Sequence, residues 1–152
     1  MNKQILIFFV ALLTATTHAQ TSESNTSEQA KQSKLAIKGF DPVAYFESGK
    51  AIEGKKEITA TFNNVVYYFS SESNKALFLK NPSYYEPQFG GFCAFGMSNG
   101  YEAPIQPEAF TIVDNKLYLN YNLKVKEMWL KEQSERIEKA NVNWEKMKKE
   151  KK

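Results

Sequence analysis

The chain has 152 residues, which is the length of one domain of ordinary size. Its 20 basic and 17 acidic side chains give a net charge of +3, and so small an excess gives no reason to expect nucleic acid as a partner. A single cysteine also excludes a disulfide within the chain.

The first 19 residues have the pattern of a secretory signal peptide. Lys3 supplies a positive start, residues 5–13 form an apolar run, and Thr17-His18-Ala19 fits a small-x-small cleavage site. The apolar run has nine residues, whereas a membrane-spanning helix needs roughly 20. We therefore predict cleavage after Ala19 and a periplasmic or extracellular protein with no membrane span.

Cleavage at this site would also remove the only histidine, His18. The mature chain then lacks the side chain that most often serves as a general base, and it lacks the Ser-His and Cys-His nucleophile pairs. A hydrolytic enzyme is therefore the least favoured function. Residues 20–34 are almost all polar and predict a disordered linker, so the folded domain is expected over residues 35–152.

The first half of this domain carries signals for a helix, a hairpin and a second helix. Asp41 is placed to cap a short helix that Gly49 ends. Residues 58–62 and 65–69 predict two strands joined by a tight turn, the second strand being central because it is apolar on both faces. Either Ser70 or Ser71 then caps a helix that stops before Pro82.

The second half predicts another hairpin and a long helix. Residues 110–113 and 116–121 flank the turn pair at 114–115. Apolar residues then recur every seven positions, and this stripe is expected to pack on the sheet; its members are Leu123, Leu130, Ile137 and Trp144. The fold class is α+β, with a small antiparallel sheet from two hairpins, short helices and a long C-terminal helix.

The glycine-rich stretch 88–97 contains the only cysteine, Cys93. Glycine on both sides of it favours an exposed turn, where a thiolate with Met97 would bind a soft metal ion such as copper or exchange a thiol. The alternative is a small buried hydrophobic residue, a common environment for an unpaired cysteine. In the first case the loop around the sulfur atom would be the binding loop; it consists of Gly90, Gly91, Phe92 and Phe95.

The eight tyrosines offer a second candidate site. Some of them would line a groove with inward hydroxyl groups, and we select Tyr45, Tyr68 and Tyr85 for this role. The other interpretation makes most of them sheet and rim residues with one end in water.

Several motifs in fixed order resemble the exported branch of the YHS-domain family. They are found at residues 39–46, 67–72, 78, 81–82, 85, 87–94 and 116–120. The resemblance covers nearly the whole mature domain and implies a small α+β fold built on a hairpin with short helices. Related metal-binding modules carry cysteines where this chain has Ala44, Ser70 and Asn74. A tetrahedral sulfur site is therefore not expected at those positions.

Two functions remain open. The first is a soft-metal or thiol-redox binding module centred on Cys93. The second is a non-catalytic module that docks another protein of the cell envelope through an aromatic groove or the face of the long helix.

Overall fold

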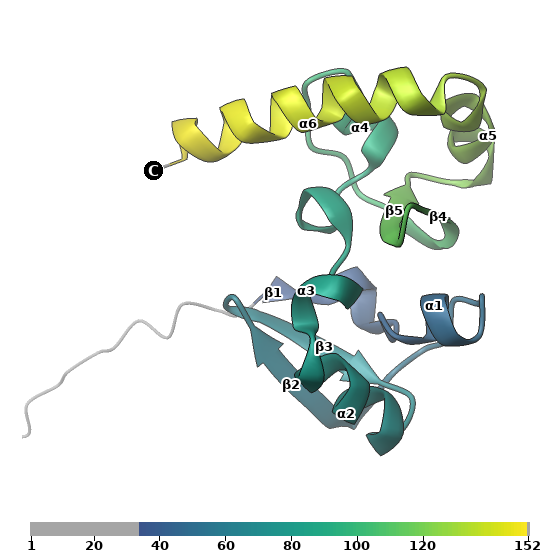
Figure 1. Cartoon of the computed structure of the whole chain (residues 1–152), viewed down its shortest axis with the longest axis vertical. Coiled ribbons are helices and arrows are strands. Elements are labelled where there is room, and N and C mark those ends of the chain that lie inside the picture. Colours follow the sequence, from purple (N-terminus) through teal and green to yellow (C-terminus); the bar gives the residue numbers. More distant parts are fainter. Residues whose placement is uncertain (1–33, 152) are drawn as a thin grey trace, which may run out of the picture. The chain divides into compact units, whose positions relative to one another are not determined.

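The computed structural model describes residues 34–151, and the fold class is α+β as predicted (Figure 1). The predicted signal peptide and all but one residue of the predicted linker lie outside this range. Within it, none of the helices combines the length and the apolar character that crossing a membrane requires.

The first sheet has three strands with β3 in the centre, in the order β1-β3-β2. Its strands are β1 (Lys34–Leu35), β2 (Lys55–Phe62) and β3 (Val65–Phe69). The predicted hairpin is confirmed: β2 pairs antiparallel with β3, and the turn places Asn63 and Asn64 at φ of 50° and 61°. The parallel pairing of β1 with β3 was not predicted.

The second predicted hairpin forms a separate sheet of its own. It consists of β4 (Gln106–Val113) and β5 (Lys116–Asn120). The expectation of one antiparallel sheet made from both hairpins is therefore wrong. The free side of β5 meets Pro87 and Cys93 through isolated bridges, so the segment between the hairpins occupies the position that a strand would need.

Short helices and turns connect the strands. The helices are α1 (Ala44–Glu47), α2 (Glu72–Lys80), α3 (Pro82–Tyr85) and α4 (Ala94–Ser98), and the turns are η1 (Ala36–Gly39) and η2 (Gln88–Gly91). Ser71 caps α2 by accepting a hydrogen bond from the backbone N–H of Asn74 at 3.1 Å. The helix α4 was missed because Gly96, together with Gly90 and Gly91 before it, was interpreted as a sign of an exposed turn.

The C-terminal region is broken into α5 (Leu123–Lys131) and α6 (Gln133–Glu150). The break lies at Glu132, whose φ and ψ of −132° and 35° are not helical. The predicted apolar stripe with its seven-residue spacing does not continue across this break. Leu123 and Leu130 are 53% and 43% exposed, and the buried residue of α5 is Trp129. The face of α6 packs mainly on α4, not on a sheet as predicted.

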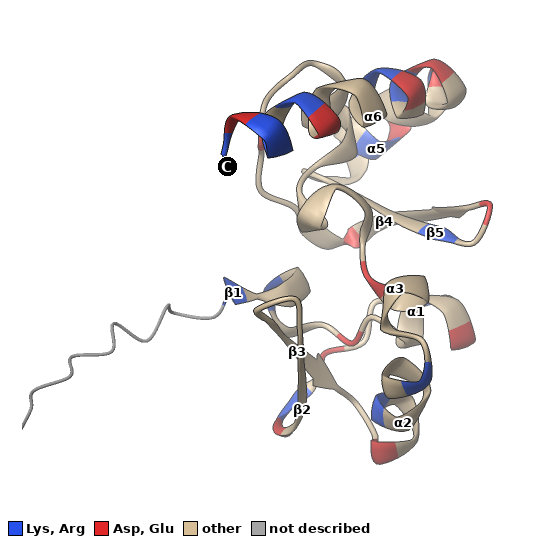
Figure 2. Ribbon diagram, turned by 60° about the vertical axis from the view of Figure 1, so that its left-hand side comes forward, with Lys and Arg blue, Asp and Glu red and all other residues tan. Residues whose placement is uncertain are grey.

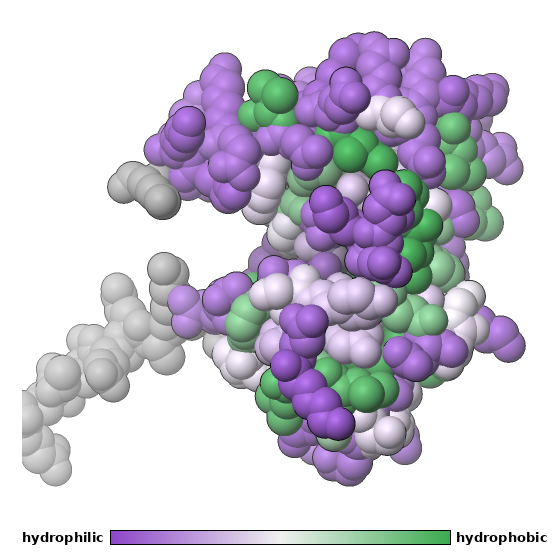
Figure 3. Space-filling model, viewed as in Figure 1, coloured by the Kyte–Doolittle hydropathy of each residue, from purple (hydrophilic) through white to green (hydrophobic). Residues whose placement is uncertain are grey.

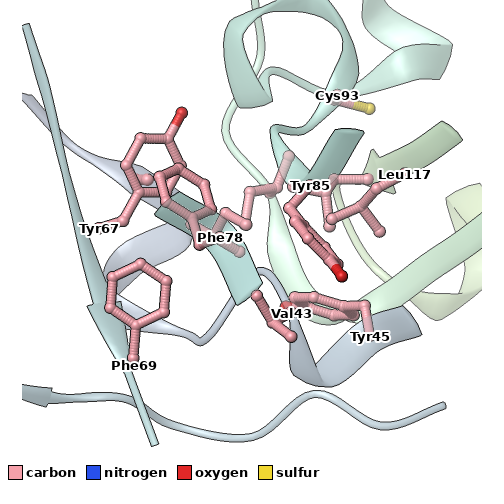
Figure 4. Close-up of a cluster of buried hydrophobic side chains, with 12 residues drawn as sticks. Val43, Tyr45, Tyr67, Phe69, Phe78, Tyr85, Cys93 and Leu117 are labelled. Atoms are coloured by element: carbon pink, nitrogen blue, oxygen red, sulfur yellow. The ribbon is translucent and has the colours of Figure 1, made fainter. Parts of the chain in front are cut away.

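The buried side chains form two clusters with β5 between them. Leu117 and Leu119 belong to the cluster that covers the first sheet, and Tyr118 belongs to the cluster under α5 and α6. This division follows from the alternation of side chains along a strand. Figure 4 shows part of the first cluster, where Tyr67, Phe69 and Phe78 lie together.

The outer face of α6 is charged. Basic and acidic residues follow one another along it (Figure 2), and most of the side chains that the space-filling view shows on this helix are hydrophilic (Figure 3). Lys139 pairs with Glu135 and Lys148 with Glu145, both within one turn of helix. Such exposed pairs stabilise a helix by only about 0.2–0.5 kcal/mol each, so we assign this face a solvating role.

Candidate functional site

Two left-handed turns stand out in the backbone. In η1, Ile37 and Lys38 have φ of 45° and 53° ahead of Gly39, and the N–H of Phe40 closes the turn on the Ile37 carbonyl at 3.0 Å. A residue other than glycine in this region costs roughly 1–2 kcal/mol, and a β-branched residue such as Ile37 is found there least often.

The turn η2 repeats this geometry with more glycine. Phe89 has φ of 56°, Gly90 and Gly91 follow at 60° and 81°, and the N–H of Phe92 closes the turn on Phe89 at 3.1 Å. A Cβ atom on Gly90 would lie 3.0 Å from the ring of Trp144, so glycine also permits close packing against α6. Strained backbone of this kind is concentrated at functional sites.

Both turns line the same pocket, which has a volume of about 490 Å³. Its other walls come from β1, β3, the residues after α3, and Trp144 of α6. Figure 3 shows a hollow between the β1 region and the end of α6. Pockets with apolar walls and a few polar groups are the usual form of small-molecule sites.

One end of the pocket holds Tyr67 and Glu86. Tyr67 is only 4% exposed, and burial, followed by the charge of Glu86, raises its pKa to about 12, so its hydroxyl group stays protonated at neutral pH. Tyr45 and Tyr85 donate hydrogen bonds to other groups, whereas the Tyr67 hydroxyl forms none with residues 34–151. Burial also raises the pKa of the Glu86 carboxyl group.

The other end of the pocket holds Lys34. Its ammonium group donates a hydrogen bond to the Gly90 carbonyl oxygen at 3.3 Å and lies 3.9 Å from the centre of the Phe92 ring. Burial lowers the pKa of Lys34, Glu102 opposes this shift, and Lys151 adds to it. We call Tyr67 and Glu86 the acidic end of the pocket and Lys34 its basic end; the lining also contains four aromatic side chains.

Cys93 does not lie in an exposed turn. It is 1% exposed and occupies the N-cap of α4, where its sulfur accepts a hydrogen bond from the Gly96 N–H at 3.4 Å and contacts the Asn120 side-chain oxygen at 3.7 Å. The prediction that the flanking glycines place Cys93 in an exposed turn was wrong, because Gly96 lies in α4 and lets Tyr101 and Ala103 pack closely against it. A Cβ atom there would lie 3.2 Å from the Tyr101 carbonyl oxygen.

Met97 is also fully buried, and it belongs to a different cluster from Cys93. Among residues 34–151 no three His, Cys, Asp or Glu side chains are grouped closely enough to hold a metal ion. The structure thus assigns both sulfur atoms to hydrophobic packing, while the hypothesis that they bind copper stays a prediction.

We expect the Cys93 thiol to react with dithionitrobenzoate at least about a hundredfold more slowly in the native protein than in concentrated guanidinium chloride. The reason is that local opening of a buried segment costs about 3 kcal/mol or more. Absorbance of the released thiolate gives the rate. A Cys93→Ser, Val142→Cys double variant is the control, because position 142 is 70% exposed and should react at once. Equal native and denatured rates for Cys93 would contradict the assignment.

The predicted binding loop is divided by the structure. Gly90, Gly91 and Phe92 line the pocket. Phe95 does not, and the central carbon of the Arg136 guanidinium group lies 4.1 Å from the centre of the Phe95 ring. Trp144, which was assigned only to the helix stripe, also lines the pocket.

The three selected tyrosines do not form the groove. The Tyr45 hydroxyl donates to the Pro107 carbonyl at 3.2 Å, the Tyr85 hydroxyl lies 3.4 Å from the Glu47 carboxylate, and Tyr68 packs against Gly39 and Gly54. The tyrosine that lines the pocket is Tyr67. It is one of the eight tyrosines of the chain, and no signal in the sequence distinguished it from the others.

A third feature is a hydrogen-bond network around Asp41, which is fully buried. Its carboxylate accepts from the backbone N–H groups of Val43 and Ala44, from the N–H and hydroxyl of Ser70, and from the side-chain amide of Asn74. Ala44, Ser70 and Asn74 are the three positions at which the predicted resemblance implied the absence of cysteine ligands. In this chain they meet at a carboxylate, which joins α1 to α2.

Comparisons of the chain with protein-family models, with curated proteins and with solved structures give no match. The resemblance to the YHS-domain family therefore stays a prediction, and the function must be argued from the geometry.

Proposed function

We propose that this domain is a non-catalytic binding module that holds a small organic ligand in the pocket between η1 and η2. The observation that carries the proposal is the pair of Tyr67 and Glu86, placed inside an aromatic-walled pocket without a hydrogen-bonding or charged partner among the described residues. Glu86 is half-buried, and neither the Tyr67 hydroxyl nor the Glu86 carboxylate is sealed from solvent, so a ligand with matching groups would form hydrogen bonds with both.

The chemistry of the pocket favours binding over catalysis. A tyrosine whose pKa is about 12 is a poor base at neutral pH, and Cys93, the one strong nucleophile of the chain, lies in the core. The polar groups of the pocket therefore suit recognition of a ligand by hydrogen bonds and charge.

A fragment screen by two-dimensional NMR would test this proposal. Using the full chain, we expect small aromatic amines, acids and alcohols to shift amide signals of residues 36–39 and 86–92, and to leave those of α2 unchanged. A Gln88→Trp variant should lose these shifts, because the larger ring fills the pocket. Gln106→Trp is the matched control, since Gln106 is exposed on β4. Shifts that persist in Gln88→Trp, or that never occur in these segments, would contradict the proposal.

Export is part of the proposal. The signal-peptide pattern of residues 1–19 and the resemblance to the exported YHS branch both support action in the periplasm or outside the cell. Immunoblotting of cell fractions would test the predicted location. An exported chain that still contains residues 1–19 would contradict the predicted cleavage.

The two earlier hypotheses keep their own tests. If Cys93 binds Cu(I) or exchanges a thiol, titration of the wild type should show this reaction and titration of Cys93→Ser should not. Equal behaviour of the two proteins would contradict this hypothesis. Docking of an envelope protein would require a partner that is retained by both the wild type and the Cys93→Ser chain. No feature of the described residues favours either over the pocket.

A further inference from the structure

The acidic end of the pocket lacks a cation. Glu86 forms no ion pair with residues 34–151, and burial is the one resolved cause of its raised pKa. Lys34 and Lys38 also line the pocket, yet neither contributes to that shift, and Glu86 does not contribute to the shift of Lys34. Among the described residues, the Glu86 carboxylate therefore has no cationic partner, and neither of the two lysines supplies one.

The walls of the pocket are suited to a positive charge. Four aromatic side chains from three parts of the chain line it: Tyr67, Phe89, Phe92 and Trp144. The faces of such rings attract ammonium groups. Two of these rings already attract cations of the protein, because the Lys34 ammonium group lies over Phe92 at the basic end and the Lys148 ammonium group lies 5.9 Å from the centre of the Trp144 ring.

Other ligand charges fit less well. An anionic head group at the acidic end would meet the Glu86 carboxylate, and a neutral one would leave that carboxylate unpaired. Lys34 already bonds to Gly90 and Phe92, and Lys38 is exposed, so that solvent and salt screen its charge.

We infer that the pocket binds an organic amine, whose ammonium group pairs with the Glu86 carboxylate and donates to the Tyr67 hydroxyl oxygen, while an apolar body packs against Phe89 and Trp144. This inference rests on the proposed function, to which it adds the class of ligand. It requires the Glu86 side chain to be ionised when the amine is bound.

Three probes with the same aromatic body and different head groups test the inference: phenethylamine, 2-phenylethanol and 3-phenylpropionate. Affinities for the full chain would be measured by NMR titration of residues 86–92. We expect phenethylamine to bind about tenfold or more tightly than the other two, because charge-assisted hydrogen bonds are roughly twice as strong as neutral ones. Equal or weaker binding of the amine would overturn the inference.

Variants locate the charge that recognises the amine. Glu86→Gln should weaken phenethylamine binding about tenfold and leave 2-phenylethanol unchanged. Glu57→Gln removes the same charge from an exposed site on β2 and should change neither. Tyr67→Phe should weaken the amine by a smaller factor. Unchanged amine affinity in Glu86→Gln would overturn the inference.

Loss of folding would not explain a loss of binding in Glu86→Gln. The pKa of Glu86 is raised in the folded state, so the stability linked to this group is present below its unfolded pKa and lost as pH rises through the folded pKa. At neutral pH the neutral glutamine should therefore leave the thermal midpoint unchanged or higher.

The failures of the two proposals are distinguishable. If the alcohol or the acid shifts residues 86–92 as strongly as the amine does, the inference about charge fails and the binding pocket stands. If none of the three probes and no fragment shifts these residues, the proposed function fails, and the inference fails with it.

Discussion

Replacing Asp41 by alanine is expected to lower the free energy of unfolding by about 3–5 kcal/mol, as measured by urea denaturation. The carboxylate accepts five hydrogen bonds, the shortest at 2.6 Å and 2.7 Å from the Ser70 hydroxyl and the Asn74 amide. Alanine would leave the backbone N–H groups of Val43 and Ser70 without acceptors in the protein interior. Each unsatisfied buried donor costs about 1–3 kcal/mol.

Removing the donors one at a time is the control for this prediction. Ser70→Ala deletes one hydroxyl donor and keeps the carboxylate and its other bonds, so we expect a loss of about 1 kcal/mol. Asn74→Ala should cost a similar amount. A cost for Asp41→Ala no larger than that of either donor variant would show that the carboxylate does not organise the network.

The network also explains how α1 and α2 are joined without the thiols of a metal site. Asp41 lies just before α1 and Ala44 begins it, whereas Ser70 lies just before α2 and Asn74 is in its first turn. Backbone N–H groups supply three of the five bonds, so the arrangement depends on the main-chain course as much as on side-chain identity.

The features that sequence predicted correctly are local. Asn63-Asn64 and Asp114-Asn115 adopt the positive φ that tight hairpins need, and Gly49 has φ of 63° after α1. In each case the signal lies within a few residues of the element it ends or turns. Such signals hold whatever the rest of the chain does.

The features that sequence did not predict depend on contacts distant along the chain. Gly96 looked like a turn residue, yet it lies in α4 because Tyr101 and Ala103 approach it closely. Cys93 is buried because the bridge to Leu119 holds it against β5. The pocket is assembled from β1, β3, η2 and α6, so no short motif in the sequence could have located Tyr67 or Glu86.

Phe78→Ala is the second change for which we expect a large effect, a loss of about 3–5 kcal/mol in the free energy of unfolding. Phe78 is fully buried on α2, beside Tyr67 and Phe69 (Figure 4). The centre of its ring lies 4.6 Å from that of Tyr67, 5.2 Å from that of Phe69 and 6.3 Å from that of Phe62. Removing the ring leaves a cavity beneath the central strand. Leu79→Ala is the matched control on the same helix, since Leu79 is 56% exposed and should cost less than about 0.5 kcal/mol.

The same substitution connects the core to the pocket. The Phe78 ring packs against the ring of Tyr67, which lines the pocket, so the cavity should let Tyr67 shift from its place beside the proposed ligand. At a temperature where Phe78→Ala is still folded, we therefore expect weaker binding of phenethylamine, and an affinity closer to wild type in Phe78→Leu, which refills most of the space. If Phe78→Ala binds the amine as tightly as Leu79→Ala does, the position of Tyr67 does not depend on this packing, and the recognition of the amine rests on Glu86 alone.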